Sequence, residues 1–272
     1  MVGALAAASF VLALRIGGRP SPRARNGLAL LAVALLGLCL FLLHHPVFLV
    51  RMLPVPNLIV LGNWIPFPCA FLAGLAWHMT PRAAWRKVLS VVALLAVCAY
   101  AVLHPLLQAR VQGGDLWRGG VCLQSSPASC SAACAATLLR THGIPAGEEE
   151  MVRVCLTNET GTLFYGLYRG LRLKTAGTPW RVEVLSGRLS DVQAQWTGPA
   201  ILTVGLRTGV SADPRYERDW GWLPGVRHAV VVFRFLPNGR VEIGDPAIGR
   251  ETWPVETLRD LWYGEGLRLV QP

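Results

Sequence analysis

Four long apolar stretches in the first 108 residues constrain this chain more than any other feature. They cover about residues 1–16, 27–50, 57–78 and 88–108, in a chain that is 53% hydrophobic overall. A helix needs about 20 apolar residues to cross a bilayer, and the last three stretches are that long. The first is shorter, but it lacks the basic start and the small-residue cleavage site of a signal peptide. We therefore predict a transmembrane region of about four helices over residues 1–108.

The basic residues between these stretches predict an orientation. The segments RIGGRPSPRARN and PRAAWRK, after the first and third stretches, are rich in basic residues, whereas the segment after the second offers mainly Arg51. Basic loops stay in the cytoplasm, so the rest of the chain is expected on the extracytoplasmic side, whether or not the first segment spans. The preference for arginine over lysine is typical of GC-rich bacteria, so we expect a multi-pass protein of a bacterial inner membrane. The lipid bilayer is its expected partner, and a second membrane protein is a candidate partner.

The net charge of +10 does not predict nucleic-acid binding, because no basic run is interleaved with aromatic residues. Histidines in or beside the apolar stretches have two interpretations, a metal or haem site or a position at the membrane interface. None lies four residues from another, so we favour the interface and expect no metal and no cofactor. Cysteines within the stretches are predicted to be small apolar residues. These residues are His44, His45, His78, His104, Cys39, Cys69 and Cys98.

Residues 121–272 have an ordinary globular composition and are long enough to bury one core. The preceding segment, 109–120, carries two Gly-Gly pairs and predicts a flexible linker. Helices are expected first, and short β-branched strands bounded by Gly, Pro, Asn or Asp are expected after them, which predicts an α+β fold. The expected helices are 130–142, 148–156 and 161–171; the expected strands are WRVEVL, PAILTV, HAVVVFRF, RVEIGD and LRLV, with a short helix, VETLRDLW, before the last.

A hairpin in this second half brings two polar residues together. Asn238 and Gly239 supply the positive φ angles of a tight turn between two strands. His228 opens the strand that enters the turn, and Asp245 ends the strand that leaves it. We expect both on one face of the sheet, within about four residues of register. His228 is either a structural histidine or a general base whose tautomer Asp245 fixes.

Cys130 and Gln124 precede the alanine-rich helix at 130–142. Ser129 is a good N-cap, which places Cys130 in the first turn, where free N–H groups and the helix dipole favour a thiolate. Gln124 could add an amide donor to the backbone N–H of Cys130, and two such donors can hold an oxyanion. In the order Gln, Cys, His, Asp, the four residues cover every role in acyl transfer through a thiolate.

The other cysteines and histidine of this half have simpler interpretations. Cys134 is predicted to be a core residue, one helical turn after Cys130. Cys122 and Cys155 are either core thiols or, in an oxidising compartment, partners in a disulfide. His142 is expected at a helix C-terminus, where it complements the dipole.

At these residues the sequence resembles the bacteriocin-processing, papain-like cysteine peptidases (cysteine peptidase family thirty-nine). These are found as the N-terminal domains of peptide-exporting ABC transporters and as stand-alone bacterial domains. The resemblance covers roughly residues 121–270 and none of the membrane region. Its landmarks are Q-x5-C at 124–130, LLRTHGI, ETGT at 159–162, GPAILTV at 198–204, HAVVVF at 228–233, VEIGDPAIG at 241–249 and LRDLWYGEGLRLV.

The resemblance implies a papain-like domain over 121–272 that cleaves a peptide or protein substrate. Cys130 would be the nucleophile, His228 the base, Asp245 the orienting carboxylate and Gln124 an oxyanion donor. The chain departs from the family where Ser129-Cys130-Ser131 replaces the usual Asp-Cys-Gly. It also has no G-x4-G-K-[ST] motif, so we expect no nucleotide and no transporter of the ABC type.

Three functions follow from these observations. The first is a membrane-anchored thiol peptidase. The second is a papain-like acyltransferase or amidase, which passes the acyl group to an amine or lipid. The third is an inactive domain that binds a peptide or a partner protein, which the departures around Cys130 favour. Gly113-Gly114 in the linker also faintly resembles a cleavage site at which the domain could release itself.

The loop before His228 carries Trp220 and Trp222. We expect these tryptophans in a cleft wall, at the membrane surface or in a packed loop.

Overall fold

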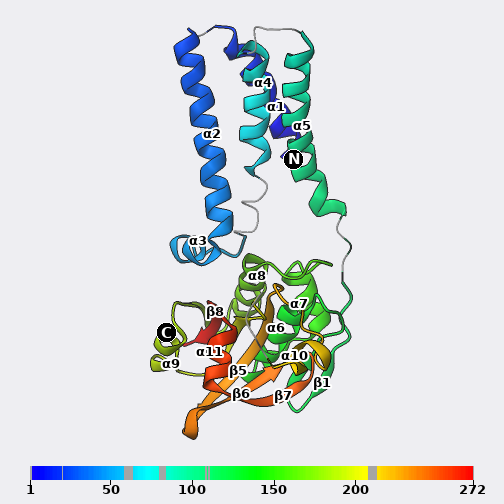
Figure 1. Cartoon of the computed structure of the whole chain (residues 1–272), viewed down its shortest axis with the longest axis vertical. Coiled ribbons are helices and arrows are strands. Elements are labelled where there is room, and N and C mark those ends of the chain that lie inside the picture. The colour runs from blue at the N-terminus through cyan, green and yellow to red at the C-terminus, as the bar shows by residue number, and fades with distance from the viewer. Residues whose placement is uncertain are drawn as a thin grey trace. The chain divides into compact units, whose positions relative to one another are not determined.

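A computed structural model of the chain describes residues 2–19, 21–57, 64–79, 84–107, 109, 111–207 and 213–271 (Figure 1). It divides into two compact units. The first, the helical region, comprises residues 1–49 and 59–108, and the second, the C-terminal domain, comprises residues 50–58 and 109–272. Each unit is described by itself.

Helices make up the described part of the helical region (Figure 1). They are α1 (Val2–Gly17), α2 (Pro22–His44), α4 (Pro66–Met79) and α5 (Ala84–Leu107), and α3 (Pro46–Met52) follows α2. Ser21 caps α2 by accepting a hydrogen bond from the Ala24 N–H at 3.3 Å, and Pro22 occupies the first turn, where its missing N–H does no harm.

Small residues hold α1 against α4. Ala13 and Ala73 are fully buried, and a Cβ on Gly74 would lie 2.6 Å from both the Ala13 Cβ and the Phe10 carbonyl oxygen. Glycine is therefore the residue that allows the two backbones this close approach. At the end of the pair, His78 Nε2 lies 2.9 Å from the Leu14 carbonyl oxygen. This contact gives His78 a structural place at a helix end.

One helix of the described residues, α2, has both the length and the composition to cross a bilayer. The prediction of four spans is therefore not confirmed. The stretch 27–50 divides at His45, after which Pro46 starts α3, because proline cannot continue the hydrogen-bond ladder of α2. The helix α1 has 16 residues and α4 has 14, and the apolar part of α5 is likewise short, at Lys87–Ala101. The multi-pass topology and the extracytoplasmic side, which rested on counting spans, lose this support.

The C-terminal domain is built on a six-stranded antiparallel sheet with the order β3-β8-β4-β5-β6-β7. Together with the helices of the domain, this sheet confirms the expected mixture of helices and antiparallel sheet. The strands are β3 (Arg181–Ser186), β4 (Ala200–Val204), β5 (His228–Leu236), β6 (Arg240–Asp245), β7 (Gly249–Pro254) and β8 (Trp262–Val270), and a separate ribbon pairs β1 (Leu116–Arg118) with β2 (Val121–Leu123). The helices are α6 (Cys130–Thr141), α7 (Glu148–Val154), α8 (Phe164–Thr175), α9 (Leu189–Ala194), α10 (Arg215–Arg218) and α11 (Val255–Leu261).

The turn between β5 and β6 has the positive φ angles expected of it, 70° at Asn238 and 68° at Gly239. The loop is longer than the expected tight turn of these two residues, because Leu236 pairs with Arg240 and Pro237 therefore joins the loop. The ladder contains a bulge between Val232 and Arg234, and its last pair joins Val231 to Gly244. That pair lies three residues from the start of β5 and one from the end of β6, so the turn and its register bring those two strand ends together.

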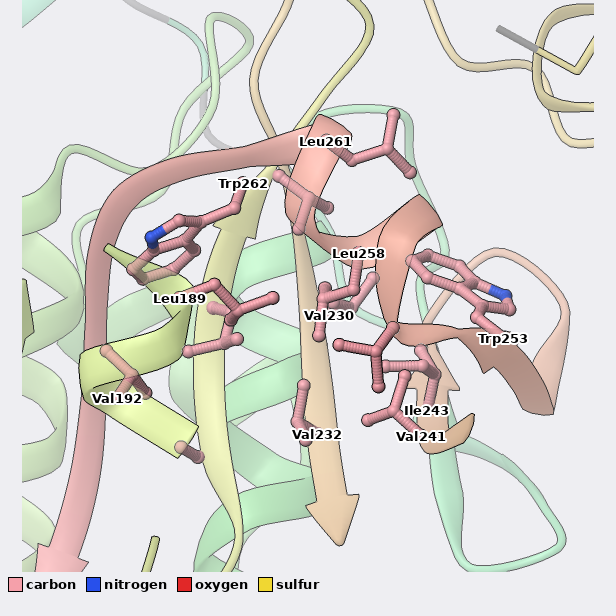
Figure 2. Close-up of a cluster of buried hydrophobic side chains, with 14 of the residues drawn as sticks. Leu189, Val192, Val230, Val232, Val241, Ile243, Trp253, Leu258, Leu261 and Trp262 are labelled. Carbon is pink, nitrogen blue, oxygen red and sulfur yellow. The ribbon is translucent and has the colours of Figure 1, made fainter. Parts of the chain in front are cut away.

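The sheet buries side chains on both faces. A cluster from β4, β5 and β6 packs under α9 and α11, and Trp253 closes it at one side (Figure 2). Val230 and Val232 belong to this cluster, whereas the alternate residues Ala229 and Val231 are buried on the other face. On that face α6 packs against β5 and β4. The alanines of α6, which are fully buried, let the helix lie close to the strands.

Candidate active site

Cys130 is the first residue of α6, at the start of a buried helix. Ser129 precedes it but does not cap the helix with its side chain. Instead the Ser129 hydroxyl donates to the Ser126 carbonyl at 2.9 Å and accepts from the Ser126 N–H at 3.1 Å. The serine thus folds the preceding turn, and the positive end of the helix remains beside the Cys130 thiol.

His228 and Asp245 form a direct pair, as the hairpin predicted. His228 Nε2 lies 2.9 Å from Asp245 Oδ1, and the carboxylate is completely buried. The Ala247 N–H donates to the same oxygen at 2.8 Å, which fixes the carboxylate by its own loop. Because Nε2 faces the carboxylate, the other ring nitrogen of His228 is the one available to the thiol.

The thiol and the imidazole shift each other's pKa in opposite directions. Burial raises the pKa of Cys130, but the hydrogen bond and charge of His228, together with the Ala229 N–H, bring it below the usual 9.0. Burial lowers the pKa of His228, but the charge and hydrogen bond of Asp245, and then the contact with Cys130, raise it from 6.5 to about 10. Both shifts favour a thiolate next to an imidazolium.

The neighbouring cysteines lack this environment. Cys134 donates a hydrogen bond to the Ala229 carbonyl at 3.2 Å, and burial raises its pKa well above 9.0. Burial also raises the pKa of Cys122 and of Cys155 to about 12. All seven cysteines of the chain are free thiols, so the structure contains no disulfide between Cys122 and Cys155. Cys130 is therefore the one of these four thiols whose contacts outweigh burial and lower its pKa.

Gln124 lies next to the loop that follows Asp245, but its side chain is held locally. Its backbone N–H donates to the Pro246 carbonyl at 2.8 Å, and its Nε2 donates to the Ser126 carbonyl at 3.0 Å. Gln124 is not among the described residues that line the cleft beside Cys130. Its Nε2 has two N–H bonds, of which Ser126 takes one, so the amide keeps a donor that the described contacts do not use.

A cleft of about 590 Å³ contains the reactive pair. Its lining comes from the start of α6, from residues between 159 and 167 and between 223 and 229, and from Thr203 of β4 and Glu265 of β8. Cys130 and His228 both belong to this lining. The residues that the cleft adds to the pair include Leu163, Phe164, Leu167, Thr203, Leu223, Val226, Arg227 and Glu265.

Trp222 contacts the candidate base, His228. The sequence left three alternatives for this tryptophan: a cleft wall, the membrane surface or a packed loop. Its ring centroid lies 4.4 Å from that of His228, and only 5% of the residue is exposed. Trp220 stacks on Trp253 at 6.1 Å, and Tyr216 packs against both. The loop is thus a packed aromatic cluster, and its cleft wall comes from the aliphatic residues that follow. The signal in the sequence is the pair of tryptophans, Trp220 and Trp222, shortly before His228.

Part of the expected flexible linker is an ordered segment of the domain. The Gly114 N–H donates to Glu148 Oε2 at 2.8 Å, and the Gly113 N–H donates to Glu149 Oε2 at 2.7 Å. Neither glycine has room for a Cβ, since one would lie 2.5 Å from a neighbouring atom. The fully buried Glu148 also accepts from the backbone and hydroxyl of Ser125, so it ties this segment to the loop that carries Gln124.

Comparison with known proteins gives solved structures alone. No family model matches the chain, and no curated protein matches it. The peptidase domain of Streptococcus ComA, a bi-functional ABC transporter involved in quorum sensing, is 18% identical, with a TM-score of 0.44 over 56% of this chain and 98% of that one. A double glycine motif protease from an AMS/PCAT transporter, in complex with a leader peptide, is 18% identical, with a TM-score of 0.44 over 61% of this chain and 99% of that one. The peptidase domain of Streptococcus mutans ComA is 19% identical, with a TM-score of 0.38 over 56% of this chain and 98% of that one. A likeness this distant says nothing about activity.

Proposed function

We propose that this chain is a thiol peptidase whose nucleophile is Cys130. The observation that supports the proposal is the series of contacts from the thiol through His228 to the buried Asp245, with pKa shifts that favour a proton on the imidazole. A structural histidine needs no such arrangement of a buried carboxylate on one side and a thiol of lowered pKa on the other. This relay is the arrangement of groups that activates a cysteine nucleophile.

In the proposed reaction, the Cys130 thiolate adds to the carbonyl carbon of a peptide bond, and the carbonyl electron pair moves to oxygen. The His228 imidazolium gives its proton to the leaving amine, and the C–N bond breaks to leave an acyl-enzyme. Water then gives a proton to the neutral imidazole and adds to the thioester carbonyl; the C–S bond breaks, the acyl group leaves as a carboxylic acid, and the thiolate is restored. Asp245 keeps the ring oriented through both steps.

Two further groups have proposed roles around this reaction. The backbone N–H of Cys130 and the free amide donor of Gln124 would hold the oxyanion, provided that the Gln124 side chain turns toward the cleft as substrate binds. Trp222 would keep water away from the His228–Asp245 pair, which strengthens their hydrogen bond. We also propose that α2 attaches the enzyme to a membrane, since most of its apolar side chains are exposed.

The test uses the full chain in detergent micelles and a library of internally quenched peptides. Cys130→Ala and His228→Ala are each expected to abolish hydrolysis, while circular dichroism shows an unchanged fold. Cys134→Ala is the matched control, because this thiol lies one turn further along the same helix and donates only to a backbone carbonyl. Hydrolysis that persists in either of the first two variants would rule the mechanism out.

Product mass separates the peptidase from the acyltransferase. A trapped acyl-enzyme that is released with the mass of water added supports hydrolysis. Release onto an added amine, with no hydrolysed product, would assign the same thiolate to transfer instead.

A further inference from the structure

Glu265 is a nearly buried acid on the wall of the cleft. It lies on β8 and lines the cleft, yet its side chain is only 11% exposed. The other acid of the cleft, Glu159, is exposed in the turn before α8. Acidic side chains are seldom buried without a partner, so the position of Glu265 requires a chemical reason.

The sheet places this acid on the same side as the reactive pair. Thr203 of β4 pairs with Ala229 of β5, the residue after His228, and both line the cleft. The strand β8 is the next neighbour of β4, and the β4–β8 register shifts between Leu202 and Val204. Strands lie about 4.8 Å apart, so β8 runs about 10 Å from β5. An extended peptide covers that distance with about three residues.

Glu265 is only partly satisfied by the protein. Arg227 Nη1 lies 2.5 Å from Glu265 Oε1. The Arg227 side chain is 58% exposed and packs over the Tyr263 ring. No described residue donates a hydrogen bond to the second carboxylate oxygen, Oε2. Burial raises the pKa of Glu265, and Arg227 opposes this only in part. A second cation within the cleft would therefore stabilise the ionised carboxylate further.

We infer that Glu265 determines specificity by selecting a cationic side chain about three residues from the scissile bond. The inference rests on the proposed peptidase function, to which it adds a substrate class. A lysine or arginine of the substrate would reach Oε2 from inside the cleft, while Arg227 keeps Oε1 at the rim. Leu163 and Leu223, which line the cleft and are each 62% exposed, would contact apolar side chains of the same peptide.

Hydrolysis by the full chain in detergent micelles tests this. The probes are pairs of quenched peptides that differ at one position, with arginine in one and neutral citrulline in the other. At one position about three residues from the cleaved bond, arginine is expected to raise kcat/KM about tenfold or more, as for a hydrogen bond between charged groups. Glu265→Gln should abolish this preference, and the control Glu159→Gln should keep it.

A second variant and a binding measurement cover the other outcomes. Arg227→Gln removes the competing cation at the exposed rim, so the preference for arginine over citrulline should increase. An unchanged preference in this variant would overturn the inference. Equal rates for both peptides in the wild-type chain would overturn it as well. If the chain hydrolyses none of the peptides, fluorescence anisotropy of the same pairs on Cys130→Ala decides. Tighter binding of arginine that Glu265→Gln abolishes would then uphold the acidic subsite while the peptidase function fails, and equal binding would overturn both.

Discussion

The helical region and the C-terminal domain differ in the side chains that they bury and expose. Where α1 packs on α4, small residues such as Ala13 and Ala73 are fully buried, together with Leu75, while Leu30 of α2 is 70% exposed. In the domain the interior contains large residues such as Trp253 and Tyr168, which are almost completely buried. The same preference of apolar surface to leave water governs both. An apolar exterior of this kind is stable only where something other than water covers it.

The difference also concerns polar groups. In the domain, Asp245 and Glu148 are completely buried, and each accepts more than one hydrogen bond. A low-dielectric interior strengthens such bonds and makes an unpaired charge costly. The domain can therefore hold a thiolate and an imidazolium side by side. The described helical region contains close packing but no comparable arrangement of buried acids.

Truncation to alanine should have unequal effects at a buried site of the domain and an exposed site of the helical region, and this contrast is the largest we expect. Trp253→Ala removes a fully buried indole from the domain core and should lower its free energy of unfolding by about 3–5 kcal/mol. Leu30→Ala shortens an exposed side chain of α2 and should change stability by less than about 0.5 kcal/mol. Hydrogen exchange of the full chain in micelles, resolved by peptide, measures both. Equal losses would show that the exposed face of α2 is packed in the protein.

Local signals in the sequence were sufficient for much of the domain. The strand HAVVVFRF and the Asn238-Gly239 turn predicted a hairpin, and the His228–Asp245 hydrogen bond follows from it. Strand order was not predictable in this way, because β8 is inserted between β3 and β4 by contacts distant in sequence. For that reason Glu265, which follows the helix α11, gave no sign that it lines the cleft.

The helical region shows the opposite limit of prediction. Apolar composition identified the stretches, but it does not determine where a helix begins and ends. The break at His45 and Pro46 is a backbone effect of proline, and it divides a stretch that hydropathy alone treats as one span. The close approach at Gly74 likewise depends on which residues face each other, and a sum of hydropathy does not contain that information.

Two thiols of one helix should differ in reactivity, and this is the second effect in size. At pH 6 to 7, iodoacetamide should alkylate Cys130 at least about a hundredfold faster than Cys134, since the thiolate is the reactive form. His228, with a pKa raised to about 10, stays protonated over this range and preserves the ion pair. The ratio should narrow as pH rises toward 10, because the small ionised fraction of Cys134 grows roughly tenfold with each pH unit while Cys130 is already a thiolate. Peptide mass mapping of the full chain measures both sites.

The control for this comparison is His228→Ala. Without the imidazolium, burial is opposed only by the Ala229 N–H and the Ser131 hydroxyl, so the pKa of Cys130 should rise. Its alkylation at pH 7 should then approach that of the other buried thiols. A rate that follows an ordinary thiol in both proteins would show that the pair exerts no effect on Cys130.

Enlarging a glycine should have opposite consequences on two helices of the helical region, with the smallest effect of the three. Gly74→Leu forces a side chain to within 2.6 Å of the Ala13 Cβ, so α1 and α4 must separate at a cost of about 1–3 kcal/mol. Gly37→Leu on α2 meets no atom within 4 Å and should be neutral or stabilising. Cys69, 2% exposed on α4, reports the separation, since its labelling by a maleimide should rise about fivefold or more in Gly74→Leu alone. Equal labelling in the two variants would mean that small residues do not set the distance between α1 and α4. The two units would then differ in amino-acid composition, but not in how closely their elements must approach to pack.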